Sequence, residues 1–199
     1  TNGIPDAFQL VVRRDSGIGQ ISDLTGKRVA LPPEQSSEYN AFQFLAQHYQ
    51  LDRSGMEMFP GTQATTDWLL INGDVDAVFR VRAPGDESVL NLIEKADAQI
   101  IPIPQAAALK LKQPSLEVGV VPQGSYNGRP AVPALDLQTI SVRQLLLASA
   151  DTPAEVISRL TAILFERRRE LVDLLPLSGA IAAPDRTGGT VLPVHPGAQ

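Results

Sequence analysis

The chain has 199 residues, of which 43% are hydrophobic and 20% charged, as is typical of a globular protein, and no apolar stretch reaches the about 20 residues that cross a bilayer. Its 17 lysines and arginines against 22 aspartates and glutamates give a net charge of -5, and no basic run carries interleaved aromatic residues, so we expect no nucleic-acid partner. Because the chain has no cysteine and only 2 histidines, His48 and His195, thiol chemistry is excluded and neither a zinc site nor any other cofactor is expected.

Short apolar runs alternate with helical patterns through the first half of the chain, which is typical of strand, helix, strand units on a parallel sheet. The expected strands are residues 8–14, 29–31, 56–59, 76–81 and 99–103. The expected helices are a turn at 22–24, a helix that Ser36 or Ser37 caps, and residues 62–71, 87–96 and 106–112. Because such units cross over with a right hand, residues 16–112 are predicted to form one compact open-sheet lobe.

The second half of the chain has a different character. Residues 114–133 are rich in proline and glycine and are expected to form a connector with one strand at 117–121. A strand at 139–147 and a long helix at 152–175, apolar on one side, should pack together, and the chain from 183 on should be irregular. We assign residues 1–15 and 113–199 to the remainder of a first lobe, with hinge strands and a C-terminal tail.

Four segments occur in an order that resembles a known family. They are Ile21–Val29, Gly73–Phe79, Pro122–Gly128 and His195–Ala198. The ordered set is similar to the solute receptors of the TAXI type of tripartite (TRAP) transporters. One segment departs from the family, because Glu34–Ser37 stands where its members usually have Gly-Ser-Gly-Thr. The usual ligand of the family is therefore not carried over to this chain.

The resemblance implies an α/β fold like that of type II periplasmic binding proteins, with two lobes of open sheets and helices on both faces. Family members begin with a further segment that this sequence lacks, so the first lobe is expected to be incomplete. The implied function is capture of a small organic anion, a carboxylate or an amino acid, in a cleft between the lobes. The receptor would present it to TRAP membrane permease subunits in the periplasm or elsewhere outside the cytoplasm, with any membrane anchor lying outside this chain, and would catalyse no reaction.

Open parallel sheets bind ligands beyond the carboxyl ends of their strands, so the residues after Leu31, Phe59 and Phe79 are candidates for a site. Ser36 and Ser37 combine hydroxyl groups with free backbone N–H groups at the positive end of a helix, which suits a carboxylate or a phosphate. The alternative is that these serines only cap the helix.

Arg80 and Arg82 give the strongest electrostatic signal. They lie two residues apart at the end of a predicted strand and therefore on the same side, where a guanidinium can bind a carboxylate through two hydrogen bonds. The alternative is that both reach solvent or pair with Asp86 and Glu87.

Three further residues are candidate ligand contacts. Tyr126 lies in the predicted return segment, Tyr39 in the first turn of the helix after Ser37, and Thr62 at the start of the next helix. Tyr39 could equally pack in the core, and Thr62 is first of all a cap candidate. Trp68 is predicted to lie in the core.

Two other classes of function remain open. The chain could be a ligand-sensing or interaction domain of a larger membrane-associated protein, in which case exposed apolar surface would favour a homodimer. It could also be an enzyme on the same fold, resembling the pyrimidine-forming proteins of the thiamine pathway. Those proteins use histidine and cysteine chemistry, which two separated histidines and no cysteine do not reproduce.

Overall fold

The computed structural model describes residues 5–52, 54–143, 148–166 and 196–198. Its contacts divide the chain into two compact units, which we describe separately: Asp6–Val142, and Thr1–Pro5 with Arg143–Gln199. Within the described ranges, no helix has the length and apolarity that a membrane span requires.

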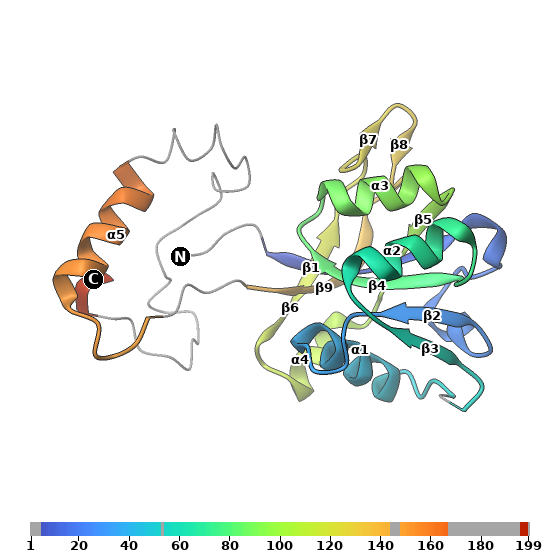
Figure 1. Cartoon of the computed structure of the whole chain (residues 1–199), viewed down its shortest axis with the longest axis horizontal. Helices are drawn as coiled ribbons and strands as arrows, with labels where there is room; N and C mark the ends of the chain where they lie inside the picture. Colours follow the sequence, from blue (N-terminus) through green and yellow to red (C-terminus); the bar gives the residue numbers. More distant parts are fainter. Residues whose placement is uncertain (1–4, 53, 144–147, 167–195, 199) are drawn as a thin grey trace. The chain divides into compact units, whose positions relative to one another are not determined.

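A seven-stranded mixed sheet forms the centre of the unit Asp6–Val142 (Figure 1). Its strands are β1 (Asp6–Arg13), β2 (Arg28–Leu31), β3 (Glu57–Pro60), β4 (Ala77–Arg82), β5 (Ala98–Ile101), β6 (Leu116–Val121) and β9 (Leu137–Val142). They follow the order β3-β2-β4-β1-β9-β6, and β5 also pairs with β1. A separate two-stranded sheet joins β7 (Asn127–Gly128) to β8 (Ala131–Val132), a hairpin that the sequence analysis did not predict.

The sheet is only partly parallel, which corrects the expectation of an all-parallel sheet. Strand β2 pairs in parallel with β3 and with β4, as the strand, helix, strand pattern predicts. Strand β1 instead runs antiparallel to its neighbours β4, β5 and β9, and β6 pairs antiparallel with β9. Apolar runs identify strands but not their directions, and no full helix connects β1 to β2.

The helices of this unit cover both faces of the sheet, as predicted. They are α1 (Ser37–His48), α2 (Gln63–Asn72), α3 (Glu87–Lys95) and α4 (Ala106–Lys112). Helices α1 and α4 pack on one face, where Phe42 and Leu109 join a buried cluster with Leu10 of β1. On the opposite face (Figure 1), α2 and α3 bury Leu70 and Leu92. Apolar side chains thus line both faces of the central strands.

The start and end of the helices follow their local sequence. The Ser36 hydroxyl oxygen accepts a hydrogen bond from the backbone N–H of Tyr39 at 3.0 Å, which caps α1. Thr62 caps α2 in the same way through Thr65. Gly73 ends α2 with a φ of 78°, a left-handed conformation that glycine adopts without strain. Both predicted caps are confirmed.

The prediction that Trp68 lies in the core is wrong, because the structure leaves 59% of this residue exposed. The buried residues of α2 are Thr66 and Leu70, which lie four positions apart on one side of the helix. Trp68, midway between them in sequence, therefore points away from the sheet.

The unit Asp6–Val142 is longer than the predicted lobe 16–112, because β1, β6 and β9 belong to its sheet. The assignment of residues 1–15 and 113–199 to a first lobe stays a prediction. In the other unit, α5 (Ala154–Glu166) begins close to the predicted start of the long helix. Residues 144–147 and 167–175 lie outside the described residues, so the far ends of the predicted strand and helix, and their packing, stay predictions.

Candidate functional site

A small cavity lies where the three parallel strands end and two helices begin. It encloses about 110 Å³. Its lining residues are Pro32, Pro33, Ser36, Glu38, Gly61, Gln63, Arg80 and Arg82. Pro32 follows β2 and Gly61 follows β3, while the two arginines end β4. The cavity is therefore at the carboxyl ends of the strands, where open α/β sheets bind ligands.

Arg80 is the most buried charged residue of the cavity, with 2% of its side chain exposed. Its Nη2 donates to Oδ1 of Asp67 at 2.6 Å and to the hydroxyl of Thr66 at 2.5 Å, and its Nη1 donates to the carbonyl of Phe79. Its Nε is buried and has no hydrogen-bond partner among the described residues. Burial lowers the pKa of the Arg80 guanidinium, and the hydrogen bond that it donates to Asp67 opposes this shift. An arginine nonetheless stays charged at neutral pH.

Arg82 is more accessible, with 29% of its side chain exposed. Its Nη1 donates to Oε1 of Glu38 at 2.6 Å and to the carbonyl of Val81, and its Nη2 donates to Oε1 of Gln63 at 3.1 Å. Glu38 and Gln63 belong to the first turns of α1 and α2. Arg82 therefore joins the end of β4 to the beginnings of both helices.

Two helix N-termini face this part of the sheet. Helix α1 has 12 residues and α2 has 10, long enough for their first backbone N–H groups to carry a partial positive charge. Ser36 lines the cavity and uses its hydroxyl oxygen as the α1 cap, which leaves its O–H free to donate. Capping and ligand binding are thus compatible at this serine.

The structure brings together three of the seven predicted site residues, Ser36, Arg80 and Arg82. Both arginines lie on the same face of β4, as predicted. They pair with Asp67 and Glu38, which corrects the alternative that they pair with Asp86 and Glu87. The carboxylate of Asp86 instead accepts from the backbone N–H of Ser88 and caps α3.

The other four predicted residues do not line the cavity. Ser37 is exposed, Thr62 is engaged as the cap of α2, and Tyr39 is half-buried against the core. Tyr126 is buried, and its hydroxyl donates to Oε1 of Gln9 at 2.5 Å. Burial raises the pKa of Tyr126 to about 12. A ligand contact by these four residues stays a prediction.

Sequence reasoning missed Glu38 and Gln63 as site residues. Both occupy the first two helical positions after a capping residue that follows a strand. Because these positions lie at the carboxyl edge of the sheet, the capped helix starts could have indicated them.

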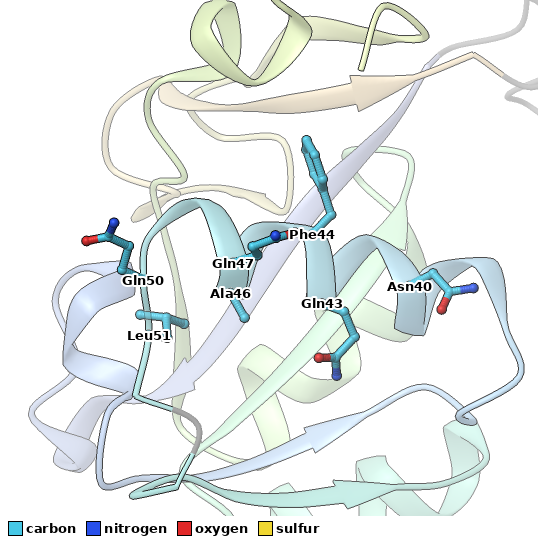
Figure 2. Close-up of a pocket in the computed structure, with 7 residues that line it drawn as sticks. All are labelled: Asn40, Gln43, Phe44, Ala46, Gln47, Gln50 and Leu51. Carbon is cyan, nitrogen blue, oxygen red and sulfur yellow. The ribbon is translucent and has the colours of Figure 1, made fainter. Parts of the chain in front are cut away.

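A larger hollow lies along α1 (Figure 2). It encloses about 670 Å³. Its lining residues are Asn40, Gln43, Phe44, Ala46, Gln47, Gln50 and Leu51, all from α1 and the segment that follows it. None of these side chains is ionisable, so the hollow offers no charge to hold an organic anion. We therefore place the candidate site at the smaller cavity.

His48 belongs to no group of candidate metal ligands among the described residues. The His48 ring has its Nε2 3.0 Å from Oε1 of Gln105 and its Nδ1 3.3 Å from Nζ of Lys112. His195 lies outside the described residues. Among the described residues, no three histidine or acidic side chains cluster as metal ligands would.

Comparison with solved structures shows the fold. The periplasmic aliphatic sulphonate binding protein SsuA from Escherichia coli is 16% identical with a TM-score of 0.50, covering 89% of this chain and 49% of its own. The alkanesulfonate-binding protein SsuA from Xanthomonas axonopodis pv. citri, bound to MOPS, is also 16% identical, with a TM-score of 0.48 and coverage of 90% and 55%. An ancestral arginine-binding protein bound to glutamine is 14% identical, with a TM-score of 0.42 and coverage of 88% and 57%.

The match to the Escherichia coli protein shows that the chain has the α/β fold of type II periplasmic binding proteins, as the resemblance implied. The chain spans about half the length of the three structures. This is the fold of solute-binding proteins. The narrower assignment to the TAXI receptors stays a prediction. Since a family model matches residues 1–199, the protein belongs to the NMT1-like family.

Proposed function

We propose that the protein is a solute-binding receptor that captures a small organic anion, a carboxylate, a sulfonate or an amino acid, at the cavity of Ser36 and Arg82, and that it catalyses no reaction. The observation that carries the proposal is the gathering of two arginines and two helix N-termini at the carboxyl ends of three parallel strands. Each of these features favours binding of a negatively charged group, and all of them lie around one small cavity.

Arg82 is the residue proposed to contact the anion. It is partly exposed, and beyond its bonds to Glu38, Val81 and Gln63 its Nε and the second hydrogen of Nη2 make no hydrogen bond with the described residues. Arg80 is proposed to add positive charge without direct contact, since it lines the same cavity but its Nη2 donates to Asp67 and Thr66 and its Nη1 to the carbonyl of Phe79. The Ser36 hydroxyl would donate a further hydrogen bond.

Binding should be measured by calorimetry against a panel of small carboxylates, sulfonates and amino acids. We expect Arg82→Gln to weaken binding of the best ligand about 10- to 100-fold, as loss of a hydrogen bond from a charged group does. Arg129→Gln removes an exposed arginine of the β7–β8 turn and serves as the matched control. Equal affinity of the Arg82 variant and the wild type would refute the placement of the site.

The proposed setting is outside the cytoplasm, in partnership with a membrane transporter. The resemblance points to the permease subunits of a TRAP transporter, whereas one similar structure is described as the substrate binding protein of an amino acid ABC transporter. Co-purification of the ligand-loaded protein with one permease type or the other distinguishes these partners. If the protein binds neither type of permease, ligand capture would not be linked to transport by these permeases.

A second candidate, an interaction or sensing domain, is favoured by strand β6. This strand lies at the edge of the sheet, and 63% of Val118 and 45% of Val120 are exposed on it. An exposed apolar edge strand pairs readily with another chain. Light scattering tests this candidate, because a dimer that Val118→Lys dissociates would support it and a monomer would not.

A further inference from the structure

The cavity contains a carboxylate of the protein itself. Oε1 of Glu38 accepts from Nη1 of Arg82 at 2.6 Å, and 26% of the Glu38 side chain is exposed. Both residues line the cavity. An anion that approaches Arg82 therefore meets a negative charge beside the positive one.

The charges around the cavity are also balanced. Arg82 pairs with Glu38, and Arg80 pairs with Asp67 at 2.6 Å. Two guanidinium groups and two carboxylates leave no formal excess of charge. A ligand that carries only negative charge would have to displace Glu38 or remain next to it, and both cost free energy in a partly buried site.

A ligand with both signs of charge avoids this cost. We infer that Glu38 is the specificity-determining residue of the site and that it accepts the ammonium group of a small zwitterion whose anionic group binds Arg82 and the start of α1. This inference rests on the proposed function and narrows its ligand class. Oε2 of Glu38 has no hydrogen-bond partner among the described residues and is the acceptor for the ammonium group.

The size of the cavity agrees with a compact ligand. Its volume of about 110 Å³ equals that of roughly four water molecules in the liquid. A small amino acid or an amino-sulfonate has about this bulk, with the two charged groups separated by one or two carbon atoms. Arg80 gives independent support for a polar ligand site. Its Nε is buried and has no hydrogen-bond partner in the described part of the chain.

The competing explanation is structural. An acidic residue in the first turn of a helix interacts favourably with the helix dipole, and Glu38 occupies such a position in α1. A purely structural Glu38 would affect stability but would not distinguish between ligands. The test must therefore measure the ratio of the affinities for two ligands rather than the affinity for one ligand alone.

The experiment compares matched pairs of ligands that differ only by an ammonium group, 2-aminoethanesulfonate against ethanesulfonate and alanine against propionate, by calorimetry at neutral pH. We expect the wild type to bind at least one amine-bearing member about tenfold or more tightly than its partner. Glu38→Gln should bring that ratio close to one. Glu38→Asp, which keeps the charge on a shorter side chain, should retain a preference for the amine.

Glu34→Gln is the matched control, because Glu34 is exposed, lies four residues earlier and does not line the cavity. It should leave the ratio unchanged. Equal binding of both members of each pair to the wild type, or an unchanged ratio in Glu38→Gln, would overturn the inference and leave the proposed function standing. Absence of binding by all four ligands, with binding of a different ligand class, would overturn both.

Discussion

The hydroxyl of Tyr126 donates a hydrogen bond to Oε1 of Gln9, 117 positions earlier in the chain, at 2.5 Å. Gln9 is fully buried in β1, and its Nε2 donates in turn to the backbone carbonyl of Arg82 at 2.9 Å. The segment after β6 is thus linked through β1 to the end of β4, where the candidate site lies. Tyr126 does not line the cavity. It is connected to the backbone of Arg82 through the side chain of Gln9.

Tyr126→Phe should lower the free energy of unfolding by about 1–2 kcal/mol, because it leaves the Gln9 side-chain oxygen buried without a donor. Urea denaturation measures the change. Tyr39→Phe is the control, since Tyr39 is half-buried but its hydroxyl makes no hydrogen bond with the described residues. If both variants are as stable as the wild type, the link between Tyr126 and Gln9 contributes nothing to the fold.

Asp67→Asn should lower the free energy of unfolding by about 2–3 kcal/mol. Arg80 would keep its charge without its carboxylate partner, while only 2% of its side chain is exposed to water. The control is Asp15→Asn, which breaks the surface ion pair with Arg13 at 2.8 Å. Exposed pairs contribute little to stability, so this variant should unfold at about the same urea concentration as the wild type. Thermal and urea unfolding give both values, and similar losses in the two variants would contradict the prediction.

The pair of Arg28 and Asp76 should make stability depend on pH in the acid range. Burial raises the pKa of Asp76, but the hydrogen bonds from the Arg28 side chain and backbone lower it more, so that its pKa lies below the ordinary value of 3.8. A carboxyl whose pKa is lower in the folded state stabilises the fold above its unfolded pKa. That contribution is lost as the pH falls through the folded value.

Asp76→Asn should therefore lower the free energy of unfolding at pH 7 by about 2 kcal/mol, and the difference from the wild type should shrink below pH 4 (~3.8 being the ordinary pKa of aspartate). Urea denaturation over a series of pH values measures this. Asp74→Asn, a neighbouring exposed aspartate, is the control and should show no such trend. A constant difference at all pH values would exclude the titration of Asp76 as its cause.

Gln43 in α1 should tolerate replacement by an apolar side chain. Its Nε2 and Oε1 are buried and make no hydrogen bond with the described residues, in the hollow of Figure 2. Gln43→Leu removes the cost of burying an amide without partners and should raise the free energy of unfolding by about 1 kcal/mol. Gln47→Leu, at an exposed position of the same helix, should give no gain. A loss of stability in Gln43→Leu would mean that its amide has a partner in solution.

The sequence alone determined most of the local structure and part of the site. The strands, the caps at Ser36 and Thr62, and the stop at Gly73 depend on residues a few positions apart, so a local pattern is sufficient to predict them. The placement of Arg80 and Arg82 on one side of β4 follows from the two-residue period of a strand in the same way. These local rules placed the candidate residues Ser36, Arg80 and Arg82 at the carboxyl edge of the sheet, beside the small cavity.

Only the tertiary structure decided which groups those residues meet. The partners of the two arginines, Asp67 and Glu38, come from two different helices, and the partner of Tyr126 comes from a strand at the other end of the sequence. The direction of β1 and the exposure of Trp68 depend likewise on packing between distant segments. A sequence pattern repeats along one element, whereas charge pairing and burial depend on how several elements pack together in space.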